Sequence, residues 1–197
     1  MTTTALLLGL LLPGAAFAAG LILWTFLEYV LHRFAFHERM LGQRVAREHL
    51  EHHAKVDHFA PLSHKVALAV PVLGAIFGLA WLVTTAPIAA GLALGVVTGW
   101  LSYEVLHRRI HVAAPLNAYG RWARRHHLSH HFGNAKLNHG VSSPIWDHVF
   151  GTHAPRATVL VPRRHATKFP WLLDDASRAP KELALQPSFT DNYRLVG

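Results

Sequence analysis

Histidines gather in a few short segments of this sequence, and their spacing suits metal binding. The chain has 17 histidines and no cysteine, which excludes a thiolate metal site. Residues three and four apart share one face of a helix. Two trios have this spacing: His49, His52 and His53, and His127, His130 and His131. Imidazole binds zinc, iron, copper or nickel, so the ligand type alone does not choose the metal.

Two histidine pairs precede these trios. His107 and His111 are four residues apart and share a helix face, whereas His32 and His37 are five apart and diverge on an ideal helix. The latter pair therefore either straddles two metal ions or lies on a distorted helix. Pairs and trios together give ten candidate ligands: His32, His37, His49, His52, His53, His107, His111, His127, His130 and His131. Ten ligands are too many for one ion and suit two ions with about five imidazoles each.

The histidine segments form an internal repeat. The segment "EYVLHRFAFH" followed by "REHLEHHAKVDH" matches "YEVLHRRIH" followed by "RRHHLSHHFGNAKLNH". Equivalent histidines are 75 to 81 residues apart, an offset that grows through short insertions. His52 then corresponds to His130, and His58 to His139. Two unrelated His-rich helix ends are the alternative, but five matching features in the same order favour a duplication.

Long apolar segments lead into the histidines and predict membrane spans. Residues 5–31 carry one charge, Glu28, and residues 66–106 carry one, Glu104. A span needs roughly 20 apolar residues, so we expect one span at about 5–31. The turn "TTAP" divides the second segment into a hairpin of spans at about 66–83 and 88–106. A cleaved signal peptide ending at "AFA" is the alternative for the first span, but no basic segment precedes it.

Positive charge is confined to the segments outside these spans. The net charge is +8, with six Lys and Arg from Arg33 to Lys65 and thirteen from Arg108 onward. Three spans put both segments on one side, which the positive-inside rule makes cytoplasmic. We therefore expect a site facing the cytoplasm, at the cytoplasmic membrane of a bacterium or the endoplasmic reticulum of a eukaryote. This distribution favours anionic lipid headgroups as the basic segments' partner, and not nucleic acid.

A histidine-rich membrane metal transporter, or another metal-binding membrane protein, is a hypothesis of a different class. Transport sites usually lie near the bilayer midplane. Here the spans contain no histidine between Leu68 and Leu106, and none precedes His32. The candidate ligands lie instead where spans end, which favours chemistry on a molecule that lies in the bilayer and is reached from its surface.

The histidine segments resemble those of a known family. "HRFAFH", "HLEHH", "HRRIH" and "HHLSHH" resemble the histidine boxes of the fatty acid hydroxylase and sterol desaturase superfamily of membrane di-iron oxygenases. "NHGVSSPIWDHVFGTH" is similar to the Trp-Asp-x-x-Phe-Gly-Thr tail of the fatty acid 2-hydroxylase branch. The resemblance covers roughly Glu28 to His153. It implies an all-α integral membrane protein with a cytoplasmic helical cap that carries a His-rich dimetal site. Relatives usually have four spans, whereas the apolar segments of this chain predict about three.

The resemblance also implies an activity and its requirements. We expect one domain over 1–197, with a catalytic cap at 32–65 and 107–170 and a tail at 171–197. Two iron ions on the ten histidines, for which zinc can substitute in a purified protein, would use dioxygen and external electrons to hydroxylate a lipid, with a fatty acyl chain as the expected substrate. No catalytic residue is expected beyond the metal ligands. A lipid desaturase, or a sterol or carotenoid hydroxylase, is the alternative.

Electrons are expected from a separate cytochrome b-type protein, or from a ferredoxin with its reductase, because the chain has no room for a fused electron-transfer domain. The oligomeric state stays open.

Several further residues are candidates for orienting the ligands through hydrogen bonds. Carboxylates near a span are costly unless paired, and Glu28 and Glu104 precede His32 and His107 by about one turn. An interfacial pair with an arginine is the alternative role for both, and a helix cap is the alternative for Asp147. The remaining candidates are His58, His126 and His139, while we expect the rest at the surface or beside the ligands: His64, His148, His153 and His165. The aromatic residues Trp146, Phe150, Phe169 and Trp171 predict a lining for the acyl chain or, preferably, a membrane-interface contact.

Overall fold

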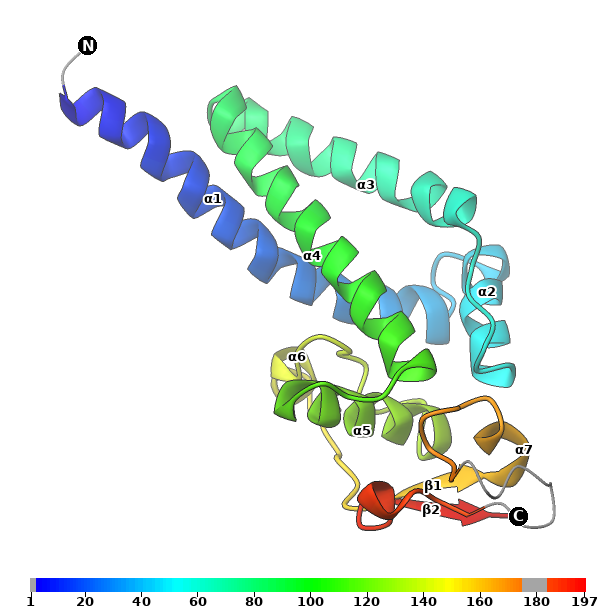
Figure 1. The fold of residues 1–197 in the computed structure, drawn as a ribbon. Helices are drawn as coiled ribbons and strands as arrows, with labels where there is room; N and C mark the ends of the chain where they lie inside the picture. The colour runs from blue at the N-terminus through cyan, green and yellow to red at the C-terminus, as the bar shows by residue number, and fades with distance from the viewer. Residues whose placement is uncertain (1–2, 175–183) are drawn as a thin grey trace. The chain divides into compact units, whose positions relative to one another are not determined.

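The structure, a computed structural model, describes residues 3–174 and 184–197. It is mostly helical, with one small sheet (Figure 1). Its elements in chain order are α1 (Thr3–Val30), η1 (Leu31–His37), α2 (Gln43–Ala54), α3 (Leu62–Val83), α4 (Ala86–Val112), α5 (Ala118–Phe132), α6 (Ile145–Val149), β1 (Val159–Pro162), α7 (Arg163–Ala166), η3 (Pro187–Phe189) and β2 (Tyr193–Val196). Residues 1–2 of the predicted domain and 175–183 of the predicted tail lie outside the described residues.

Two compact units make up the chain. The first combines residues up to Glu28 with Ala60–Tyr103, and the second combines Tyr29–Phe59 with Glu104–Gly197. The first unit holds most of the long apolar helices. The second holds all ten candidate metal ligands, so the site can be described within one unit.

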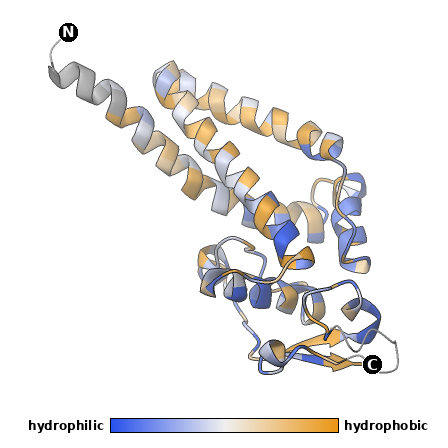
Figure 2. Cartoon of the chain, in the orientation of Figure 1, coloured by the Kyte–Doolittle hydropathy of each residue, from blue (hydrophilic) through white to orange (hydrophobic). Residues whose placement is uncertain are grey.

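Three helical segments are long and apolar enough to cross a membrane: Leu11–His37, Leu62–Val83 and Ala86–Val112. Figure 2 shows the apolar residues concentrated along α1, α3 and α4. Among the described residues, the number of candidate spans therefore matches the predicted three. The second and third helices are longer than the predicted spans at 66–83 and 88–106. Hydropathy marks only the apolar part of a helix, whereas the helical backbone continues into polar residues. Prolines such as Pro61 and Pro115 then interrupt it.

Glycine lets α1 and α4 approach closely within the first unit. A Cβ on Gly20 would overlap the carbonyl oxygen of Leu92, and a Cβ on Gly95 would overlap that of Phe17. Small residues at such crossings are typical of membrane helix pairs. The two helices that lead into the histidine segments therefore pack backbone against backbone.

The second unit contains a parallel pair of strands, so the all-α expectation needs a correction. β1 pairs with β2 in the register Val159↔Tyr193 to Pro162↔Val196, and Val159 and Val161 are fully buried. Four-residue strands are too short to give a period-two pattern, and the paired residues are 34 apart along the chain. Sequence pattern alone could not reveal this pairing.

Candidate metal centre

The structure gathers the ten candidate ligands into two groups of five, and within each group the ligand atoms all lie within 4.8 Å of one another. The first histidine group consists of His32, His37, His49, His53 and His130. The second histidine group consists of His52, His107, His111, His127 and His131. Each group takes four residues from one half of the repeat and one from the other half.

The exchanged ligands are His52 and His130, which are equivalent in the repeat. On α2, His49 and His53 contribute to the first group while His52 contributes to the second. On α5 the division is reversed. The expectation that each trio points the same way therefore holds only coarsely, because residues at i and i+4 share one row of a helix whereas i+3 lies on the adjacent row. Each helix serves both groups.

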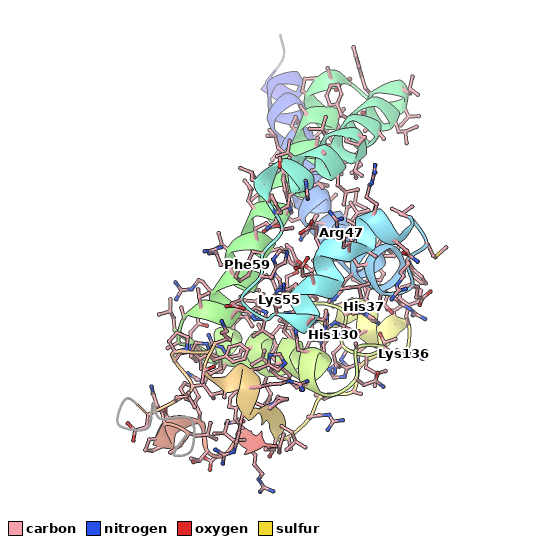
Figure 3. The ribbon with its side chains drawn as sticks, turned by 90° about the vertical axis from the view of Figure 1, so that its right-hand side faces the viewer. His37, Arg47, Lys55, Phe59, His130 and Lys136 are labelled. Carbon is pink, nitrogen blue, oxygen red and sulfur yellow. The ribbon has the colours of Figure 1, made fainter. Side chains whose placement is uncertain are left out.

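The helix at His32 and His37 is distorted, which decides between the two possibilities left open by their spacing. η1 is a π-helix, in which hydrogen bonds join residues five apart, so both side chains reach the first group. The Nε2 atoms of His37 and His32 are 3.3 Å apart, and His37 Nε2 lies 2.9 Å from that of His130. Figure 3 shows His37 and His130 beside each other. In the second half, His107 and His111 are four apart on the regular helix α4, so the π-helix absorbs one extra residue.

Ring nitrogens also converge in the second histidine group. His127 Nε2 lies 3.1 Å from His111 Nε2 and 3.0 Å from His131 Nε2. The His52 ring is 4.7 Å from that of His107. The rings of His53 and His131 stack at 4.1 Å, which joins the two groups into one cluster.

Burial keeps these imidazoles neutral. Desolvation lowers the pKa of His49, His127, His130 and His131 well below the ordinary value, and it lowers the pKa of His53 to about 3. A neutral imidazole keeps a lone pair on one ring nitrogen, which a metal ion requires. Ten imidazole donors in two adjacent groups, each ligand buried or half-buried, therefore fit two transition-metal ions.

Backbone carbonyls fix the orientation of three ligands. His32 Nδ1 donates a short hydrogen bond to the His139 carbonyl, His130 Nδ1 donates to Leu137 at 2.8 Å, and His52 Nδ1 donates to His58 at 2.7 Å. A proton on Nδ1 leaves Nε2 as the free donor, so these bonds set both the tautomer and the ring direction. His58 and His139 support the ligands through their backbones.

Asp147 is fully buried and holds the loop that supplies two of those carbonyls. It accepts hydrogen bonds from the His139 amide at 2.7 Å, the Gly140 amide at 2.8 Å and the Thr152 hydroxyl at 2.7 Å. His126 Nε2 lies 3.3 Å from its second oxygen. Burial opposes ionisation, but these hydrogen bonds outweigh it and lower the pKa of Asp147. Asp147 lies inside α6, so it anchors the loop and does not cap the helix.

Glu48 is a supporting residue that sequence reasoning missed. Its Oε2 lies 2.9 Å from His58 Nε2, and so it steadies the residue whose carbonyl orients His52. The signal was weak, because Glu48 looks like any polar residue of a helix. With Glu51 and His58 it forms a half-buried cluster.

The other predicted residues divide between buried and exposed positions. Glu28 is buried at the end of α1, and Glu104 is half-buried on α4; their roles remain predictions. His64 and His148 are exposed, while His153 and His165 are half-buried, and all four lie outside the two groups. His126 is buried and stacks on Trp122 at 5.3 Å.

The predicted aromatic residues lie mostly inside the second unit. Phe169 is fully buried, and its ring stacks on His111 at 5.9 Å. Trp171 is also buried and donates a hydrogen bond to the His111 carbonyl. The preferred membrane-interface role is therefore wrong for Phe169 and Trp171, which pack behind the second histidine group. Phe150 stacks on Tyr29 at 5.1 Å, and Trp146 is half-buried.

The sequence is similar to those of curated fatty acyl and fatty acid 2-hydroxylases. A dihydroceramide fatty acyl 2-hydroxylase of Arabidopsis thaliana is 33% identical over 138 residues, which cover 68% of this chain and 58% of the relative. The fatty acid 2-hydroxylase of Homo sapiens is 30% identical over 151 residues, covering 73% of this chain and 40% of the relative. This chain thus spans less than two thirds of the length of these curated relatives.

A solved structure and a family profile agree with these relatives. The hydroxylase domain seen in the structure of full-length scs7p matches with a TM-score of 0.61 at 30% identity, covering 73% of this chain and 57% of that one. The profile of the fatty acid hydroxylase family matches residues 17–152, which contain all ten clustered histidines and Asp147. The chain belongs to the fatty acid hydroxylase family.

Proposed function

We propose that this protein is a membrane-bound, metal-dependent oxygenase that hydroxylates a C–H bond of a lipid, with a fatty acyl chain as substrate. The observation that carries the proposal is the convergence of ten buried or half-buried histidines into two adjacent groups of five. The names of the relatives support the substrate class, since they describe 2-hydroxylation of fatty acids and of the acyl chain of dihydroceramide. A desaturase or a sterol or carotenoid hydroxylase would need the same dimetal core.

The residues of each group have distinct tasks in this proposal. The first and second histidine groups would each hold one ion through neutral imidazole nitrogens. When bound, two iron ions supply the activation of dioxygen with two external electrons. The carbonyls of His58, Leu137 and His139 hold three imidazoles in the tautomer that binds metal. Asp147 keeps the loop of Leu137 and His139 in place, and burial excludes water from the rings.

The membrane orientation is part of the proposal. The basic segments that follow the spans favour a cytoplasmic site, at the cytoplasmic membrane of a bacterium or the endoplasmic reticulum of a eukaryote. Electrons then come from a separate cytochrome b-type protein, or from a ferredoxin with its reductase. Reporter fusions at Thr85 and Gly197 test this orientation, and a C-terminus on the outer side would contradict it.

Lipid analysis of cells with and without the protein tests the reaction. A lipid that gains the mass of one oxygen is the expected result, and it should require wild-type protein. His130→Ala serves as the inactive comparison, and His148→Ala, an exposed histidine outside both groups, serves as the matched active control. Loss of two hydrogens would indicate a desaturase. Unchanged lipids with altered metal uptake would contradict the proposal and favour transport.

A further inference from the structure

Arg124 is a buried arginine on α5 that the proposed chemistry does not use. It is only 2% exposed, and its guanidinium reaches the last turn of α4. Nε donates to the Ile110 carbonyl at 3.1 Å, and Nη2 donates to the carbonyls of Arg109 at 3.2 Å and of Ala113. The last carbonyls of a helix lack partners within the helix, and the negative end of its dipole attracts a cation there.

Trp171 completes the arrangement from the C-terminal segment. The Arg124 guanidinium lies 3.9 Å from the centre of the Trp171 ring, a favourable cation–π geometry. Trp171 Nε1 donates to the His111 carbonyl at 3.0 Å. The two side chains thus hold four carbonyls at the end of α4, and one of these belongs to a residue of the second histidine group.

We propose that Arg124 and Trp171 form a clamp on the end of α4 that positions His111 for metal binding by the second histidine group. This positioning role rests on the proposed function only because it assumes that the second histidine group binds a metal ion. The clamp itself is a property of the helix end. Phe169, stacked on the His111 ring, limits the ring's movement from the same segment.

The repeat indicates that this clamp serves one half of the molecule. The residue equivalent to Arg124, at the same offset that relates His49 to His127, is Ala46, a fully buried residue of α2. Alanine cannot reach a neighbouring helix end. In the first half, a π-helix and not a clamped α-helix presents the equivalent pair, His32 and His37.

Lysine is not expected to replace this arginine. A guanidinium is planar, offers several donors in a fixed fork and stacks on an aromatic ring, whereas an ammonium is a strongly hydrated point charge. Burial lowers the pKa of Arg124 to about 10, so the side chain stays charged at neutral pH. A buried charge is costly without partners, which the three backbone carbonyls and the Trp171 ring supply.

Two measurements on full-length protein in detergent test the clamp. The first is hydrogen exchange of metal-free protein, with Arg124→Met, Arg124→Lys and Trp171→Phe compared with wild type. We expect faster exchange confined to residues 109–115 in all three variants. Arg121→Met, an exposed arginine one turn earlier on α5, is the control and should leave exchange unchanged. Unchanged exchange at 109–115 in Trp171→Phe and in every Arg124 variant that folds would overturn the clamp.

The second measurement is a Co²⁺ titration followed by absorption spectroscopy. Wild type should bind two ions. Arg124→Met should keep one ion at wild-type affinity and bind the other about 10–100-fold more weakly, without rescue in Arg124→Lys. Trp171→Phe keeps the aromatic face but loses the donor to His111, so it should alter the spectrum of that second ion alone. Equal weakening of both ions would overturn the positioning role. A wild type that binds fewer than two ions would instead contradict the proposed function, while hydrogen exchange would still decide on the clamp.

Discussion

The two histidine groups hold equivalent ligands, but their supports differ. In the first group, a π-helix aligns His32 and His37, and a loop anchored by buried Asp147 orients His32 and His130. In the second group, a regular helix end carries His107 and His111, with Arg124 and Trp171 on its carbonyls. Ligand spacing is almost the same in the two halves of the repeat, whereas the residues that orient the ligands differ. Removing one support should therefore affect one group more than the other.

The exchanged histidines set the limit of that difference. His52 belongs to the second group and His130 to the first, so each half of the repeat completes the group of the other half. We propose that the halves hold one shared dinuclear centre.

Loss of an exchanged ligand should have the largest effect. We expect His52→Ala and His130→Ala each to abolish product formation, because each removes a ligand that the opposite half cannot replace. Product is measured in membranes that contain equal amounts of folded protein, with His148→Ala as the active control. Substantial product from either variant would mean that the halves act separately.

Acidification should weaken both groups. The pKa values of His49, His127, His130 and His131 are well below the ordinary 6.5 in the folded protein, so below pH 6.5 the unfolded chain binds more protons than the folded chain. Stability is then constant above this pH and falls as the pH drops towards the folded values, by up to about 1.4 kcal/mol per pH unit for each such histidine.

Melting temperatures of metal-free protein at pH 7.5, 6.5 and 5.5 measure this effect. His127→Ala and His130→Ala should each make the fall shallower, since each removes one buried imidazole from a different group. A melting temperature independent of pH would show that the clustered histidines are not held neutral by burial.

Asp147→Asn should act mainly on the first group. The NH₂ group of asparagine is a donor and cannot accept the hydrogen bonds that one carboxylate oxygen of Asp147 accepts. The loop that orients His32 and His130 would therefore lose part of its anchor. We expect metal affinity of the first group and product formation to fall about 10–100-fold, while the second ion stays bound. Co²⁺ titration distinguishes the ions, and Asp191→Asn, an exposed aspartate, is the control. Equal loss of both ions would contradict the prediction that Asp147 supports mainly the first histidine group.

His58→Ala should have the smallest effect. The variant keeps the backbone carbonyl that accepts from His52 and loses only the ring contact with Glu48. We expect product formation to fall by less than about 10-fold, the lower end of effects for residues behind a metal ligand. A complete loss of product, measured as for His52→Ala, would mean that the His58 ring itself binds metal.

The sequence predicted the ligands better than their arrangement. Helical spacing and the repeat named the ten histidines that the structure brings together. The family is confirmed, and the described residues contain the expected three candidate spans. The division of each trio between two groups could not be predicted. With 3.6 residues per turn, i+3 lies about 60° to one side of residue i and i+4 about 40° to the other, and the spacing does not say which side faces which group. The five-residue spacing of His32 and His37 allowed a distorted helix without requiring one.

The supports were harder to predict for a physical reason. Arg124 and Asp147 interact mainly with backbone groups, which every residue has, so no side-chain pattern marks the partner. Trp171 lies 60 residues beyond His111, and the strands β1 and β2 are too short for a periodic signal. Such contacts depend on how distant segments pack. The aromatic residues of the C-terminal region predicted a membrane-interface contact, but Phe169 and Trp171 are buried.

Metal content tests the central claim most directly. Protein produced in iron-rich medium and purified without chelator should contain two metal ions per chain, one for each histidine group. The ions are counted by elemental analysis of folded, monodisperse protein against its amino-acid content. A value of two would agree with a dinuclear centre built from both halves of the repeat. A value of one would contradict it, because the ten clustered histidines would then include five that bind no metal.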